Sequence, residues 1–86
     1  MYEINTEKIL FTQLGEEGVI YDMDKNEYLT LNETYYKILK GVEEGQSTIA
    51  IVQALCTEYR ISEQECLAEV EEALTALNTK KIILKV

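Results

Sequence analysis

Residues 18–39, GVIYDMDKNEYLTLNETYYKIL, decide which fold the sequence predicts. The segment from Gly18 to Asp24 is short and rich in side chains that favour strands, and Glu27–Leu31 repeats this character after a polar reversal. Asn32 then precedes apolar residues at helical spacing, where an asparagine can cap a helix by accepting a hydrogen bond from an amide of its first turn. The stretch therefore predicts a strand, a turn, a second strand and a capped helix.

A calcium-binding loop is the alternative interpretation of residues 22–33. Their oxygen-bearing side chains occupy the first, third, fifth and twelfth positions of an EF-hand loop. The sixth position, normally a glycine with positive φ, is Glu27, for which that conformation costs about 1–2 kcal/mol. An EF-hand loop is also entered from a helix, whereas residues 18–23 favour a strand. We therefore predict no metal site, with Asp22 and Asp24 as solvated side chains near the end of a hairpin.

The pairing of these two strands can be predicted from polarity. A three-residue loop would set Met23 opposite Leu29 and Tyr21 opposite Leu31, which gathers apolar side chains on one face of the hairpin. Polar or amphipathic side chains would then share the other face: Asp22, Tyr28 and Thr30. We expect this register.

The flanking sequence extends the pattern in both directions. Lys8–Leu14 predicts a first strand, and Gly15 and Gly18 are expected to bracket a turn that contains two glutamates. Downstream, the first helix should stop near Gly45, and two serines are placed to cap two further helices. These helices are expected after Ser47 and Ser62, and the last residues could form a short strand or a docked end. The predicted fold is α+β, with a three-stranded antiparallel sheet followed by three helices.

Composition limits the possible functions. A chain of 86 residues should form one domain, residues 1–86, and no apolar run approaches the roughly 20 residues needed to cross a bilayer. No secretory signal is visible, so the cytoplasm is the expected location. With 16 acidic against 8 basic residues, the net charge of −8 disfavours binding to nucleic acid or to anionic membranes. Cationic or neutral partners are favoured.

No catalytic or cofactor chemistry is predicted. The chain has no histidine, no nucleophile elbow and no glycine-rich phosphate loop. Cys56 and Cys66 are too few for a disulfide scaffold or an ordinary zinc site, and we expect buried thiols, with a bridge between them left open. We therefore predict a binding protein without cofactor.

The order and spacing of several motifs resemble the PqqD-like family, the peptide-recognition domains of pathways that modify ribosomally made peptides. The matching segments span about Ile9 to Ile83 and are the strand V-I-Y-D at 19–22, Tyr28, L-N-E-T at 31–34, the S-x-x-x-I-x-x-x-L pattern from Ser47 to Leu55, and Tyr59. The turn lacks the glycine that members often have, and residues 78–80 replace another glycine, which affects the expected loop conformations more than the assignment.

This resemblance implies a winged-helix-like fold that binds the leader segment of a precursor peptide. The leader would add as a fourth strand beside the third strand and against the third helix, and would be presented to a separate modifying enzyme or leader peptidase. Standalone chains of this length are similar to the leader-binding proteins of lasso-peptide clusters. The implied peptide-binding residues are Tyr28, Leu29, Thr30 and Leu31 on the strand, and Leu67, Val70, Glu71 and Leu74 on the helix.

The helix residues in this set also have ordinary structural interpretations. A helical apolar stripe usually faces the protein's own interior, so Leu67, Val70 and Leu74 are expected to be at least partly core. Glu71 fits a solvated helix face, and a contact with a basic leader residue is the functional alternative.

Two other functions fit the same fold. A winged-helix DNA-binding regulator would place its third helix in a major groove, but residues 63–72 contain five glutamates and no basic residue, so phosphates would repel them. A general protein-interaction adaptor would use the same edge strand to pair with another protein or with its own copy.

Overall fold

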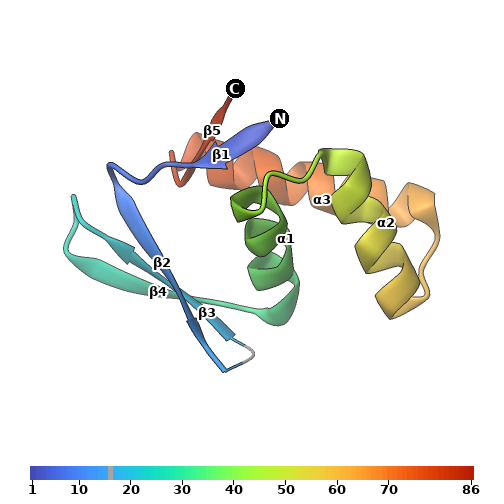
Figure 1. The fold of residues 1–86 in the computed structure, drawn as a ribbon, viewed down its shortest axis with the longest axis horizontal. Coiled ribbons are helices and arrows are strands. Elements are labelled where there is room, and N and C mark those ends of the chain that lie inside the picture. The colour runs from blue at the N-terminus through green and yellow to red at the C-terminus, as the bar shows by residue number, and fades with distance from the viewer. Residues whose placement is uncertain (16) are drawn as a thin grey trace.

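The computed structural model of the chain describes residues 1–15 and 17–86 and has an α+β fold (Figure 1). Its elements are β1 (Tyr2–Ile4), β2 (Ile9–Leu14), β3 (Glu17–Asp22), β4 (Glu27–Leu31), α1 (Glu33–Glu43), α2 (Thr48–Tyr59), α3 (Glu63–Thr79) and β5 (Ile83–Lys85). Strands β2, β3 and β4 form an antiparallel sheet in that order. The predicted winged-helix-like class, a three-stranded sheet followed by three helices, is confirmed.

The predicted helix boundaries follow from local chemistry and are confirmed. Each helix begins at a side chain that accepts a hydrogen bond from an amide of the first turn: Asn32 from Tyr35 N at 2.8 Å, Ser47 from Ala50 N at 3.2 Å, and Ser62 from Glu65 N at 3.2 Å. At the end of α1, Gly45 has φ +78°, and two backbone N–H groups return to the last turn, as in a Schellman motif.

The register of the β3–β4 hairpin differs from the prediction. Tyr21 pairs with Tyr28 and Asp22 with Glu27, so the loop has four residues instead of three. Tyr21 therefore shares a face of the sheet with Tyr28, and not with Leu31 as expected. The Asp22 carboxylate closes this loop by accepting hydrogen bonds from the amides of Asp24 and Lys25, at 3.0 and 3.1 Å. This local turn chemistry sets the register, and the polarity of the strands does not.

The corrected register places Ile20 on the inner face of the sheet, where its side chain is buried. Tyr21 and Tyr28 lie together on the outer face, with ring centroids 4.8 Å apart. The polarity argument failed because this outer face carries aromatic side chains that are stable when only partly covered.

Gly18 lies within β3 and does not help to bracket a turn, contrary to expectation. A Cβ atom at this position would come within 2.6 Å of Cδ1 of Tyr36 on α1. The glycine therefore allows α1 to pack directly on the central strand. The other part of that prediction includes residue 16, which lies outside the described part of the chain.

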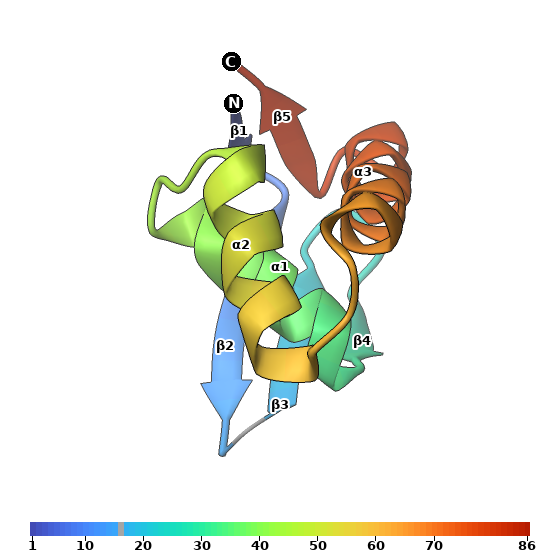
Figure 2. The same ribbon diagram turned by 90° about the vertical axis from the view of Figure 1, so that its right-hand side faces the viewer.

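The helices cover one face of the sheet, with α1 between the sheet and the other two helices (Figures 1 and 2). The core is apolar throughout and is formed by Ile9, Ile20, Leu31, Tyr36, Ile38, Leu39, Val42, Ile51, Val52, Leu55, Cys66, Val70, Ala73, Leu74, Leu77, Ile82 and Ile83. Cys66 is buried and Cys56 half-buried, both as free thiols. Burial and the neighbouring Cys56 raise the pKa of the Cys66 thiol.

A second, two-stranded sheet joins the two ends of the chain. β1 pairs antiparallel with β5, Ile4 opposite Ile83. The tail was expected to form a strand or a docked end, and it forms a strand. Its partner β1 was not predicted, because three residues are too short to show alternation. Among the described residues, none of the three helices combines the length and apolar character needed to span a bilayer.

Candidate functional site

Strand β4 is an edge of the three-stranded sheet, and among the described residues no strand pairs with its outer side. Met23 N–H donates to the carbonyl of Lys8 at 2.8 Å, and hydrogen-bonded pairs alternate along an antiparallel ladder. Since the backbone of Met23 faces β2, every second residue before it, including Tyr21 and Val19, also faces β2, and the other residues of β3 face β4. The β4 partners of these other residues include Leu29 and Leu31, so the backbone groups of these two residues point toward β3. Those of Tyr28 and Thr30 point outward, away from the sheet. Two residues of β4 thus offer unpaired N–H and C=O groups to a further strand.

The side chains of β4 alternate between the two faces. Tyr28 is 75% exposed on the outer face, and Leu31 is buried beneath α1. Leu29 points to the inner face yet is 44% exposed, because the helices do not cover this corner of the sheet. An apolar side chain at an open sheet edge is available for contact with a partner.

A hollow of about 270 Å³ lies beside the start of β4 and the end of α3. We call it the β4 hollow. Its apolar lining is Ile20, Leu29 and Ile82, and its charged lining includes Lys8, Lys25 and Lys80 with Asp22 and Glu27. Three of the eight basic residues of this acidic chain therefore gather at one corner of the sheet.

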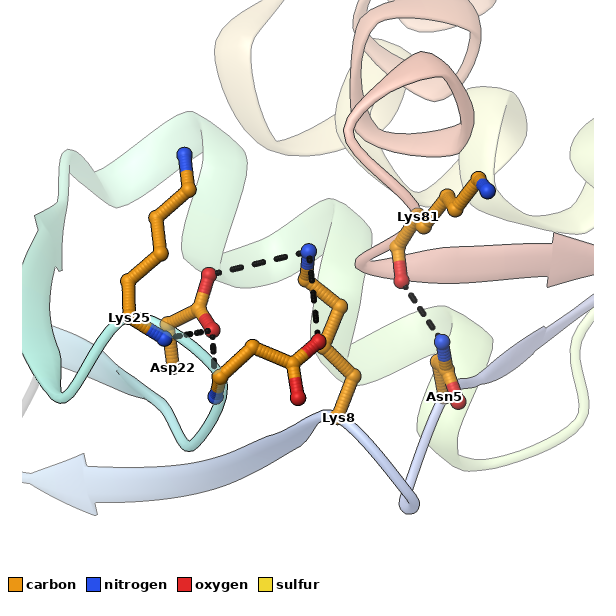
Figure 3. A network of polar contacts seen from close by, with 6 residues as sticks. Asn5, Lys8, Asp22, Lys25 and Lys81 are labelled. Atoms are coloured by element: carbon orange, nitrogen blue, oxygen red, sulfur yellow. Dashed lines mark hydrogen bonds and ion pairs between the residues drawn. The ribbon is translucent and has the colours of Figure 1, made fainter.

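Ion pairs and hydrogen bonds fix part of this hollow (Figure 3). Lys8 Nζ lies 3.8 Å from a carboxylate oxygen of Asp22 and 4.0 Å from one of Asp24. Next to the lining residues Lys80 and Ile82, Asn5 Nδ2 donates to the carbonyl of Lys81 at 2.9 Å, and Asn5 N donates to that of Ile82 at 3.0 Å. The turn after α3 is thus held in place by the segment between β1 and β2.

The predicted residues of α3 have different environments. Val70 and Leu74 are buried in the core. Leu67 is partly exposed and lines another hollow, together with Ile49 and Val52 of α2. Glu71 is exposed and lies one turn after Leu67. The structure thus brings Tyr28 and Leu29 together with the end of α3, through Lys80 and Ile82, and whether the four α3 residues contact a peptide stays a prediction.

Sequence reasoning missed the lysines of the β4 hollow. Lys8 precedes β2, Lys25 lies in the hairpin loop and Lys80 follows α3, so no spacing in the sequence connects them. Only the tertiary fold brings them together.

A second hollow, of about 230 Å³, lies where the start of α1 meets α2 and α3. Its lining includes Thr34 and Tyr59, and α3 contributes Glu65 and Glu69. Thr34 follows β4 closely in the sequence. The segment from β4 to the start of α1 therefore has the β4 hollow with its three lysines at one end and this second hollow with Glu65 and Glu69 at the other.

An ion-pair network ties α1 to α2 next to this second hollow. Lys37 contacts the carboxylates of Glu33, at 3.0 Å, and Glu58, and its ammonium lies 4.9 Å from the ring centroid of Tyr59. The hydrogen bond from Lys37 lowers the pKa of Glu33, and the bond to Glu58 raises the pKa of Lys37. The network is exposed to solvent, so it positions the start of α1 more than it stabilises the fold.

The acidic loop that resembled a calcium site is a hairpin turn. The Asp22 carboxylate accepts two backbone N–H groups and pairs with Lys8, and Asn26 Oδ1 accepts a hydrogen bond from the hydroxyl of Tyr21. In the part of the chain that is described, no three cysteine, aspartate or glutamate side chains are grouped to hold a metal ion.

Comparison with known proteins places the chain in a family. The model of the family described as coenzyme PQQ synthesis protein D (PqqD) matches residues 17–83. The chain belongs to the PqqD family. The matched region of this PqqD-family chain begins at β3 and ends at the first residue of β5, so it contains β4, all three helices and the lining of the β4 hollow except Lys8. No curated protein sequence matches the chain.

Two solved structures share the fold of this PqqD-family chain. The first is TbiB1 in complex with the TbiA(beta) leader peptide, with a TM-score of 0.88 and 23% identity over 98% of this chain and 96% of that one. The second is a lasso peptide synthetase B1 complexed with the leader peptide, with a TM-score of 0.86 and 23% identity over 98% of both chains. At this identity the likeness establishes the fold.

Proposed function

We propose that residues 1–86 act as one domain that binds the leader segment of a ribosomally made precursor peptide. The leader adds to the sheet as a further strand beside β4, and the domain presents it to a separate modifying enzyme or leader peptidase. The observation that carries this proposal is the outward-facing backbone of Tyr28 and Thr30 beside the β4 hollow. Membership in the PqqD family and likeness to two proteins solved with leader peptides support it.

The two features of the site contribute differently to binding. Backbone hydrogen bonds from Tyr28 and Thr30 would hold any extended segment, so they supply affinity with little sequence preference. The β4 hollow supplies the preference, because its apolar floor of Ile20, Leu29 and Ile82 accepts an aliphatic or aromatic leader side chain. Lys8 is already paired with Asp22 and Asp24, so Lys25 and Lys80 are the lysines that would favour an acidic leader residue next to the bound apolar side chain. Glu65 and Glu69 would favour a basic leader residue farther along the peptide.

The pathway and the location follow as further parts of the proposal. Similarity to a lasso peptide synthetase B1 favours a lasso-peptide precursor, and such a precursor would be met in the cytoplasm. The role is that of a carrier without cofactor, which leaves the chemical step to the partner enzyme.

Charge argues against DNA as the ligand. Glu63, Glu65, Glu69, Glu71 and Glu72 are all exposed on α3, the helix that a winged-helix regulator would insert into DNA. Their charges would repel the phosphates that supply most nonspecific DNA affinity. An extended peptide meets no comparable repulsion at β4.

Calorimetric titration with the precursor leader encoded beside this gene tests the proposal. We expect a Kd of about 1 μM or tighter, corresponding to about −8 kcal/mol. A peptide of the same composition in scrambled order is the control, and a DNA duplex tests the other ligand class. A flat titration with the leader, or equal affinity for the scrambled peptide, would contradict the proposed function.

A further inference from the structure

The opposite edge of the sheet, β2, is also open. β2 pairs only with β3 among the described residues, and the alternation that leaves Tyr28 and Thr30 free on β4 turns the backbone of Phe11 and Gln13 outward on β2. The N–H of Ile9 also points outward, but it donates to the carbonyl of Asn5 at 3.0 Å. The free part of this edge therefore begins after Ile9.

The β2 strand lacks the features that usually protect an open edge. Its sequence, ILFTQL, contains no charged residue and no proline. On its outer face Leu10 is 53% exposed and Leu14 is 62% exposed. Open edges in natural proteins usually carry charges, prolines or bulges, because an apolar edge pairs readily with other chains. An edge with this composition is explained if a partner covers it.

A hollow of about 620 Å³ lies beside this edge, the largest described on the molecule. We call it the β2 hollow. It is bounded by β1, the start of β2 and the end of α1, and its apolar lining includes Ile4, Leu10, Phe11 and Val42. It can accept one or two large apolar side chains from a strand that pairs with Phe11.

The charged side chains at the β2 hollow are of one sign. Glu3 and Glu43 line it, and none of the described residues that line it is basic. Glu43 pairs with Lys40 at 3.0 Å, whereas Glu3 is exposed with no ion pair to a described residue. A partner segment with a lysine or arginine beside its apolar side chain would complement this rim.

We propose that the β2 edge and the β2 hollow together form the docking surface for the modifying enzyme. The enzyme would contribute an extended segment that carries an apolar side chain next to a basic one. This inference rests on the proposed function, which requires a second protein partner besides the leader. β2 and β4 are separated by β3, so the enzyme segment and the leader can occupy opposite edges of one sheet at the same time.

The test compares two glutamate substitutions on the same strand. Leu10 and Leu14 lie on the same face of β2 and are similarly exposed, but only Leu10 lines the β2 hollow. The probe is the purified modifying enzyme encoded in the same gene cluster, titrated against the full chain. We expect Leu10→Glu to weaken enzyme binding about tenfold or more, as for a central interface residue, and Leu14→Glu to change it less than threefold.

Leader binding, measured on the same variants, separates this inference from the proposed function. Wild type, Leu10→Glu and Leu14→Glu should bind the leader equally, and circular dichroism should show the same fold in all three. A flat leader titration together with selective loss of enzyme binding in Leu10→Glu would reject the proposed function and retain the docking surface. Enzyme binding that is absent in the wild type, or equal in both variants, would overturn the docking surface.

Two further measurements test the partner's identity and its charge. If sedimentation shows that the chain self-associates and that Leu10→Glu abolishes only this association, a second copy covers the edge and the proposal is wrong. Glu3→Lys should weaken enzyme binding several-fold at low salt and less at high salt. An unchanged affinity for Glu3→Lys would overturn the basic character assigned to the enzyme segment.

Discussion

The two edges of the central sheet, β2 and β4, differ in what surrounds the same free backbone. β4 runs through a single residue, Asn32, into α1, and its hollow is lined by three lysines together with Asp22 and Glu27. β2 ends at Leu14, carries no charged side chain and borders a larger hollow that is lined by two glutamates. Because backbone hydrogen bonds alone select little sequence, these surroundings must decide which chain pairs with which edge. One small sheet can therefore carry two different partners.

The largest expected effect comes from proline at the β4 edge. Thr30→Pro removes an outward N–H and places a ring where a guest strand would lie, so leader affinity should fall at least about tenfold, or about 1.4 kcal/mol. Thr30→Ala keeps the N–H and should bind nearly as wild type. Calorimetry with the leader measures both.

The matched variant on the other edge is Gln13→Pro, which removes an outward N–H from β2. Its leader affinity should stay within about twofold of wild type, while both proline variants keep the wild-type circular dichroism spectrum. Equal losses in Gln13→Pro and Thr30→Pro would show that the two edges are not distinct.

A smaller effect is expected from the charges at the β4 hollow. Lys80→Glu should weaken leader binding up to about fivefold at low salt, because exposed charge pairs contribute about 1 kcal/mol or less. Lys85→Glu makes the same change in net charge on β5, away from this hollow, and serves as the control. If both variants lose the same affinity at each salt concentration, only net charge matters and the leader has no acidic residue at this corner.

The smallest effect concerns the attachment of β4 to α1. Lys37 lowers the pKa of Glu33 below the ordinary value of 4.5, so the ionised carboxylate stabilises the folded state above that pH and loses this effect as the pH falls. Urea unfolding at falling pH, from about pH 6 to pH 3, should therefore show a slightly steeper loss of stability in wild type than in Glu33→Gln. Parallel curves would show that this exposed pair does not affect the start of α1.

Local features of the fold could be predicted from the sequence. Helix starts at Asn32, Ser47 and Ser62 depend on one side chain and one nearby amide, and the stop at Gly45 depends on one residue's φ. Such features are visible in a single sequence because their physical cause lies within a few residues.

Features set by distant contacts could not be predicted. The β3–β4 register is closed locally by Asp22, but the face that it buries is decided by the packing of Ile20 under the helices, which lie far away in the sequence. Strand β1 is defined only by its pairing with β5. At the candidate site the sequence predicted Tyr28 and Thr30 on an edge strand, but it could not bring Lys80 or Ile82 beside them.

Asn5 connects the segments of the chain that line the β2 hollow and the β4 hollow. Its neighbours Ile4 and Thr6 line the β2 hollow, and its own hydrogen bonds hold the turn that contributes Lys80 and Ile82 to the β4 hollow. A partner that shifts Asn5 from either side would alter the shape of the other cavity. Thermodynamic linkage then requires reciprocity: if the docked enzyme changes leader affinity by some factor, the leader changes enzyme affinity by the same factor. Binding of the enzyme would in this way control when the leader peptide is released.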